Sequence, residues 1–256
     1  MLIVLSPAKS LDEGRARDKA LTAPRFLAQA QDLVDRMRGK TPKDLQKMMD
    51  ISPALASLNW HRFQDWTPDG AFSAASLFDG DAYKTLRWDD LDADTQATGQ
   101  LRLRLLSGLY GLLRPLDAIA PYRLEMGRAL APGKPLVAYW GARIAHALDA
   151  DAEAVGARWL LNLASEEYAS SIDRRALRLP VVSPVFKDRG KDGFKVVSFH
   201  AKRARGAMVR WALLHHPTHP DDLLAFSWKG YAWDPRSAPD APTFLREAQD
   251  GDGQDG

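Results

Sequence analysis

Basic side chains are concentrated in one stretch of the sequence, and clustered cations can bind the phosphates of nucleotides and nucleic acids. Residues 187–210 hold eight basic and two acidic residues, a difference of +6 in a chain whose formal net charge is +2. The basic residues are Lys187, Arg189, Lys191, Lys195, Lys202, Arg203, Arg205 and Arg210. The stretch predicts contact with an anion, although a solvated basic face would have the same composition.

The local pattern predicts where that anion would lie. A glycine-rich β-hairpin is expected over 186–195, a strand over 194–200 and a helix from about Ala201 to His215. Lys202 and Arg205 would then lie near the helix start and within about 60° of each other around its axis. Cations are unfavourable at the positive end of a helix dipole unless an anion compensates them. We therefore predict that Lys202 and Arg205 bind phosphate.

Two glycines suggest a second kind of phosphate contact. The turn Ser107–Gly111 follows a helix predicted over 92–106 and precedes a short helix predicted after Pro115. Its Gly-hydrophobic-x-Gly spacing resembles that of helix-hairpin-helix DNA-binding elements, where glycines let backbone N–H groups approach a phosphate. Gly108 and Gly111 are therefore candidate DNA contacts. An ordinary glycine helix end followed by a tight turn is the alternative.

Several other kinds of chemistry are excluded by residue type. The chain has no cysteine, which rules out disulfides, iron–sulfur clusters, thiolate zinc sites and thiol nucleophiles. His215, His216 and His219 lie at a predicted helix end, where the dipole favours histidine, so we predict no metal site there. No cofactor is predicted.

The elements that must position these residues are strands and helices in irregular order. Residues 2–5 form an apolar run expected to be a strand, and residues 24–66 are expected to be mostly helical because Ser, Thr and Pro stand at helix starts. Later helices are expected over 138–148 and 165–172, and strands over 158–163 and 181–187. This order predicts an α+β fold with a mixed β-sheet surrounded by helices.

Composition limits the class of protein further. With 45% hydrophobic and 27% charged residues, the 256-residue chain is expected to be globular, with a single domain over 1–248 and a disordered acidic tail over 249–256. No apolar stretch approaches the roughly 18 residues of a membrane span, and no signal peptide is recognised. We therefore expect a cytoplasmic protein that does not bind membranes.

Six blocks of sequence resemble, in order and spacing, the signature blocks of the bacterial YaaA family. They extend along the chain from Met1 to about Tyr231, at residues 5–12, 106–117, 121–127, 162–168, 184–187 and 201–206. The resemblance implies a cytosolic peroxide-stress protein that lowers damage from intracellular iron. It also implies a DNA-binding protein with an α+β fold, a helix-hairpin-helix element and a basic cleft.

These blocks contain carboxylates as well as cations. The carboxylates are Asp12, Asp117, Glu125, Glu166 and Glu167. Glu166 and Glu167 stand at a predicted helix start, where negative charge is favoured, and Glu125 could simply pair with Arg123. Alternatively, Glu125 or Glu166 serves as the acid–base group of an active site.

Two functions remain open at this point. The first is sequence-independent binding of DNA, most simply double-stranded, through Gly108, Gly111 and a cleft of Lys9, Arg123, Lys187, Lys202 and Arg205. The second is an enzyme acting on an anionic or phosphate-bearing small molecule. Both require those five cations to line one concave, electropositive surface.

Overall fold

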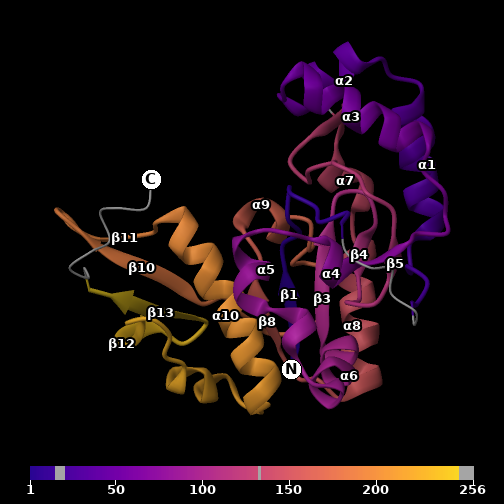
Figure 1. Cartoon of the computed structure of the whole chain (residues 1–256). Helices are drawn as coiled ribbons and strands as arrows, with labels where there is room; N and C mark the ends of the chain where they lie inside the picture. The colour runs from indigo at the N-terminus through magenta and orange to yellow at the C-terminus, as the bar shows by residue number, and fades with distance from the viewer. Residues whose placement is uncertain (15–20, 132–133, 248–256) are drawn as a thin grey trace.

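A five-stranded sheet lies at the centre of the molecule, in a computed structural model that describes residues 1–14, 21–131 and 134–247 (Figure 1). The strand order is β4-β3-β1-β8-β9, and within it only β4 runs antiparallel to its neighbour. The strands are β1 (Leu2–Leu5), β3 (Leu103–Ser107), β4 (Gly111–Leu113), β8 (Leu160–Leu163) and β9 (Val181–Val182). All four residues of β1 are buried, as a continuous apolar run predicts for a strand covered on both faces. The predicted tail over 249–256 lies outside the described residues.

Three helices confirm the helical prediction for residues 24–66. They are α1 (Leu27–Arg38), α2 (Pro42–Met49) and α3 (Pro53–Gln64). Thr41 and Asp44 form a capping box at the start of α2, and the Ser52 hydroxyl accepts a hydrogen bond from the Leu55 N–H at 3.3 Å. These signals are readable in the sequence because each lies within a few residues of the helix that it starts.

Further helices and short strands lie between α3 and β8 in the sequence. Between α3 and β8 the chain forms β2 (Phe72–Ser73), α4 (Ala74–Leu77), α5 (Asp81–Leu86), the 3-10 helix η1 (Trp88–Asp90), α6 (Ala93–Arg102), β5 (Ala118–Ile119), β6 (Ala129–Ala131), β7 (Lys134–Pro135), α7 (Leu136–Trp140) and α8 (Arg143–Val155). β2 pairs with β5, and β6 pairs with β7. After β8 comes the short helix α9 (Glu166–Ala169).

A second sheet of four strands is formed by the C-terminal part of the chain. Its order is β11-β10-β13-β12, and the strands are β10 (Val185–Gly190), β11 (Gly193–Lys195), β12 (Ala232–Ala238) and β13 (Ala241–Arg246). β10 and β11 form the predicted hairpin, with Gly190 opposite Gly193. In Figure 1 this hairpin extends away from the central sheet.

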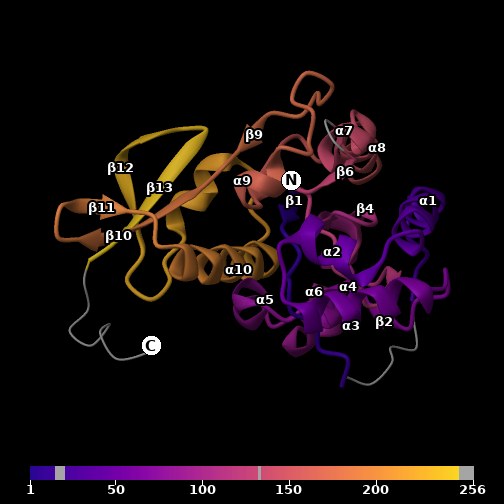
Figure 2. The same cartoon turned by 90° about the horizontal axis from the view of Figure 1, so that it is seen from above.

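The long helix α10 (Ser198–His215) lies between the two sheets and is followed by the 3-10 helix η2 (Pro220–Ala225). It packs against α5 on one side and against β10 on the other (Figure 2). The predicted strand over 194–200 is therefore wrong beyond Lys195, because the helix starts three residues before the predicted Ala201. Lys202 becomes the fifth helical residue and Arg205 the eighth, so the helix dipole argument does not apply to them.

The predicted helix-hairpin-helix element is also wrong. α6 ends at Arg102 and the chain continues as β3, so Ser107 pairs with Gly111 across the turn of a β-hairpin. Every residue from 103 to 113 is buried, and a Cβ atom on Gly108 would lie 2.1 Å from the Leu124 carbonyl oxygen. Leu105 and Leu106, which fall within the helix predicted over 92–106, belong instead to a strand buried on both sides. Gly108 and Gly111 therefore serve close packing and present no backbone amides to a duplex.

The predicted fold class is confirmed. Helices cover a mixed central sheet, and a second sheet is attached through α10, which is an α+β arrangement. Within the described residues, no helix has both the length and the apolar character needed to span a membrane.

Candidate functional site

A pocket of about 470 Å³ opens where two neighbouring parallel strands end. β1 ends at Leu5 and leads into the loop 6–10, while β8 ends at Leu163 and leads into the loop 164–165 and α9. The chain leaves β1 for β3 on one side and later returns to β8 on the other. Such a reversal of strand order at the carboxyl edge of parallel strands is the usual place for a ligand site in α/β sheets. The start of α5 and one face of α10 complete the walls.

Three of the predicted phosphate-binding cations line this pocket. Lys9 comes from the loop after β1, and Lys202 and Arg205 come from α10. Lys202 is exposed and Arg205 is partly buried, and no carboxylate among the described residues pairs with either of them. Burial lowers the pKa of the Arg205 guanidinium, which nevertheless stays charged at neutral pH. The pocket therefore contains two cations whose charge no described carboxylate neutralises.

Glu125 lies behind Lys9 and is almost fully buried. Its carboxylate accepts hydrogen bonds from Arg123 at 2.8 Å and from Arg128 at 3.1 Å, and it lies 3.4 Å from the Lys9 ammonium. Burial acts to raise the pKa of Glu125, but Lys9, Arg128 and Arg123 outweigh it and hold the pKa below its ordinary value. Glu125 is therefore a carboxylate that is charged at neutral pH and orients three cations.

The pocket also contains acidic side chains, which the sequence analysis did not place beside the cations. They are Asp79, Asp81, Glu166 and Glu167. Glu167 accepts a hydrogen bond from the Gly127 N–H at 3.0 Å, and Asp79 lies 3.8 Å from Lys84. Glu166 is exposed, and no hydrogen bond or ion pair engages its side-chain carboxylate within the described part of the chain. The predicted surface was electropositive, whereas this pocket presents both signs of charge.

The remaining predicted residues lie elsewhere. Arg123 adjoins the pocket only through the carboxylate of Glu125, which it shares with Lys9. Lys187 is on β10 in the second sheet, opposite Leu245, and does not line the pocket. The five cations therefore do not form one continuous lining.

Two serines that were not among the predicted site residues line the pocket. Ser6 follows β1 and Ser165 follows β8, so the pairing of these strands brings them together. The Ser165 N–H donates to Ser6 Oγ at 2.8 Å, and Ser6 Oγ donates to Ser165 Oγ at 3.3 Å. The signal for them was a serine one or two residues after each buried apolar strand.

Two tyrosines form part of the pocket wall. The Tyr83 hydroxyl donates to the Ser6 carbonyl oxygen at 2.9 Å. Burial, with Tyr122 and Tyr168 nearby, raises the pKa of Tyr83 well above its ordinary value. Burial, with Glu167 and Glu125 nearby, likewise raises the pKa of Tyr168. Both rings therefore remain neutral and serve as walls of the pocket, and Tyr83 also donates a hydrogen bond.

A separate basic surface runs along the second sheet and the start of α10. We call it the basic arm, and it consists of Lys187, Arg189, Lys191, Lys195, Lys202 and Arg203. Lys191 and Lys195 are exposed, and no described carboxylate pairs with them; Arg189 lies 3.7 Å from Glu247. Asp188, inside the same hairpin, is buried and paired with Arg246 at 2.5 Å, so it does not neutralise the surface. Only Lys202 belongs to both the basic arm and the pocket.

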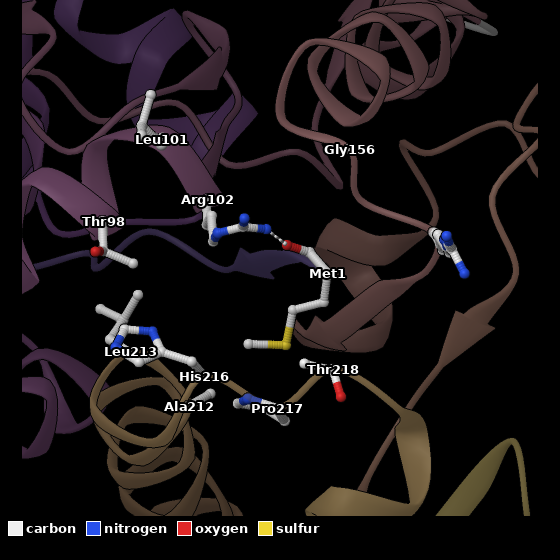
Figure 3. A pocket seen from close by; sticks show the side chains of 11 residues that line it. Met1, Thr98, Leu101, Arg102, Gly156, Ala212, Leu213, His216, Pro217 and Thr218 are labelled. Carbon is white, nitrogen blue, oxygen red and sulfur yellow. Dashed lines mark hydrogen bonds between the residues drawn. The ribbon is translucent and has the colours of Figure 1, made fainter.

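A second hollow, of about 540 Å³, lies at the amino ends of the parallel strands (Figure 3). Figure 3 shows Arg102 donating a hydrogen bond to the Met1 carbonyl oxygen, with His216 and Pro217 on the opposite side. No carboxylate lines this hollow among the described residues, so it offers no acid–base pair. Within the same residues, no group of His, Asp and Glu side chains is arranged to hold a metal ion.

Comparisons with known proteins identify the family. The family described as peroxide stress protein YaaA matches residues 1–237. A UPF0246 protein of Ruegeria sp. (strain TM1040) is 49% identical over 96% of this chain and 100% of its own length. A UPF0246 protein of Cupriavidus metallidurans is 44% identical over 98% of this chain and all of its own length. With these matches along nearly the whole sequence, the chain belongs to the peroxide stress protein YaaA family.

Proposed function

We propose that this protein takes part in peroxide resistance by binding double-stranded DNA through its phosphates along the basic arm. The supporting observation is the exposed hairpin of β10 and β11, whose lysines Lys191 and Lys195 have no carboxylate partner among the described residues. Contacts from such lysines go to the backbone and not to base edges, so binding would be independent of sequence. Gly108 and Gly111 have no part in this proposal.

DNA binding of this kind offers a route to lower iron-dependent damage. A protein that neutralises phosphates releases the cations condensed on them. Iron ions held by the backbone would be released with the rest, and peroxide would then react with iron farther from the DNA. This function needs no metal ligand on the protein. A protein with this function is expected in the cytoplasm.

The proposal is tested by the salt dependence of DNA binding. Replacing Lys191 and Lys195 with Ala should flatten the slope of log K against log[salt] by about one to two units, since each phosphate contact contributes about −0.9. The matched control replaces Lys43 and Lys47, which are equally exposed on the distant helix α2. Equal slopes for the wild type and the arm variant would reject the basic arm as the DNA surface.

The pocket at the ends of β1 and β8 favours a second candidate function, an enzyme acting on a small anionic molecule. Its position at the reversal of strand order and its volume of about 470 Å³ are those of a small-molecule site. Glu166 is the acid–base candidate, because it is exposed in the pocket and unengaged by any described residue. Glu125 fits this role poorly, because a carboxylate with a lowered pKa is a weak base.

Replacing Glu166 with Gln separates the two functions. In cells that lack their own copy, an enzymatic role predicts that Glu166→Gln abolishes protection against peroxide while folding and DNA affinity stay normal. Glu153→Gln, a change at an exposed position of α8, is the control. Full protection against peroxide by the Glu166→Gln variant would show that Glu166 is not the acid–base group.

A further inference from the structure

We propose that the pocket at the ends of β1 and β8 binds a nucleotide through its terminal phosphomonoester, supplied by a free nucleotide or by the phosphorylated end of a DNA strand. This inference rests on the second candidate function, because it names the class of ligand for the same pocket. It does not require DNA binding by the basic arm.

The phosphate position is defined by Lys202 and Arg205. They are three residues apart on α10, so their side chains are neighbours on one face of the helix. Both line the pocket, and neither is paired with a carboxylate within the described residues. Arg205 is partly buried, and burying a cation without a partner is unfavourable unless a ligand supplies the counter-charge. The Arg205 guanidinium can donate two hydrogen bonds to two oxygens of one phosphate, and the Lys202 ammonium beside it adds a second positive charge.

The charge of these two residues favours a terminal phosphate over an internal one. A phosphomonoester carries about −1.5 to −2 at neutral pH, which matches two cations. An internal phosphodiester carries a single negative charge, and its strand continues on both sides. A pocket of about 470 Å³ holds one nucleotide and has no room for a strand that runs through it.

Ser6 and Ser165 supply a hydroxyl donor in the lining of the pocket. The Ser165 N–H donates to Ser6 Oγ, and the Ser6 hydroxyl in turn donates to Ser165 Oγ. This order leaves the Ser165 hydroxyl hydrogen free to donate to a bound oxygen. Because both serines are held by the ends of adjacent strands, the donor is positioned before the ligand arrives.

The acidic side chains explain why the ligand would be a nucleotide and not a bare anion. Carboxylates beside a bare phosphate only repel it, whereas a nucleotide also carries hydroxyl and amino donors. Glu166 is exposed in the pocket and available to accept such a hydrogen bond, as acidic residues do with ribose hydroxyls at other strand ends. The neutral rings of Tyr83 and Tyr168, together with Leu5 and Leu163, give an apolar wall for the rest of the ligand.

The first test is a titration of the full chain with AMP, adenosine and inorganic phosphate. We expect AMP to bind, adenosine to bind far more weakly, and Arg205→Ala to lower AMP affinity by at least about tenfold. The matched control is Arg174→Ala, because Arg174 is exposed but belongs neither to this pocket nor to the basic arm. If Arg205→Ala unfolds, Arg205→Lys and Ser165→Ala provide the same comparison.

The second test distinguishes the two sources of the phosphate. A short duplex with phosphorylated ends is compared with the same duplex carrying hydroxyl ends, and with a closed circle that has no ends. AMP binding that depends on Arg205 supports a free nucleotide, and tighter binding of the phosphorylated duplex that depends on Arg205 supports a strand end. If neither ligand shows dependence on Arg205, the inference is wrong. Loss of binding to the closed circle by the Lys191 and Lys195 variant tests the basic arm alone.

Discussion

At the scale of single residues, Glu125 supplies the negative charge that holds three cations beside the pocket. Its side chain is 6% exposed, whereas its partners Arg123, Arg128 and Lys9 are 17%, 29% and 60% exposed. Removing the charge from a buried carboxylate leaves its partners without compensation, although their partial exposure lets water replace some of the interaction. Glu125 therefore contributes to stability and to the position of Lys9 at the same time.

Replacing Glu125 with Gln should lower the free energy of unfolding by about 1–3 kcal/mol at neutral pH, as measured by urea denaturation. The pKa of Glu125 is held below its ordinary 4.5 in the folded protein. A group with a lowered folded-state pKa stabilises the protein above its unfolded pKa and loses that effect as pH falls through the folded value. The difference between wild type and Glu125→Gln should therefore shrink below about pH 4.5. A difference that stays constant down to pH 2 would contradict this.

If DNA binds along the basic arm as proposed, the same variant should bind DNA as well as the wild type, because Glu125 and its partners Lys9 and Arg123 lie outside that arm. Salt-controlled titration measures this. Weaker DNA binding by a folded Glu125→Gln protein would show that the cations around Glu125 also contact DNA.

The residues of the candidate site differ in how far the sequence could predict them. Lys202 and Arg205 were found because helical spacing alone places them on one face. Ser6 and Ser165 were missed because their contact depends on the pairing of β1 with β8, which no local pattern reveals. The prediction that Lys202 and Arg205 stand at the positive end of the helix dipole was wrong, because α10 begins three residues before the predicted start.

At the scale of elements, the position of α10 depends on its close contact with α5. A Cβ atom on Gly206 would lie 1.8 Å from the Ala82 carbonyl oxygen and 2.4 Å from Thr85 Oγ1. Thr85 Oγ1 also donates to the Arg203 carbonyl oxygen at 2.7 Å. A glycine at 206 lets the two helices approach, and this approach places Lys202 and Arg205 beside the start of α5.

Replacing Gly206 with Ala should force α10 away from α5 and lower the free energy of unfolding by about 1–3 kcal/mol, the usual effect of overpacking. Thermal denaturation measures the loss. Gly39→Ala is the control, because Gly39 has φ −72° and its added Cβ would meet only the Arg36 carbonyl oxygen, 3.8 Å away. An unchanged melting temperature for Gly206→Ala would mean that α5 can move without cost.

Helices and strands were predicted correctly where residues close in sequence, such as helix caps, determine them. The prediction was wrong where pairing with a strand distant in sequence determines the backbone conformation. The caps at Thr41 and Ser52 identified α2 and α3 without knowledge of the rest of the chain. Residues 103–107 have leucines compatible with a helix, yet they form a strand because β1 lies beside them. The backbone groups of such a buried segment must be paired, and the neighbouring strand supplies the partners.

At the scale of the whole molecule, the second sheet depends on a buried ion pair near the end of the described chain. Arg246 on β13 binds Asp188 on β10, and the Tyr231 hydroxyl donates to the same carboxylate at 2.7 Å. Both charged side chains are less than 10% exposed. The hairpin that carries the basic arm is therefore held in place by a residue far along the sequence.

Replacing Arg246 with Ala should leave the buried Asp188 charge uncompensated and lower the free energy of unfolding by about 3–5 kcal/mol. It should also speed protease cleavage within residues 187–195, as measured by limited proteolysis. Arg236→Ala, which breaks the exposed pair with Asp234, should have little effect on either measurement. Equal proteolysis of the two variants would show that the basic arm does not need the buried pair.

The place of β1 in the centre of the sheet also governs how the protein reaches this structure. Strand β1 pairs with residues 103–105 on one side and 160–163 on the other. Both of its edges must stay open until these partners have been synthesised, and pairings over such sequence distances form slowly. During that interval four consecutive apolar residues are available to other chains, so aggregation during synthesis competes with folding. Chaperones that cover residues 2–5 during synthesis would therefore favour folding over aggregation.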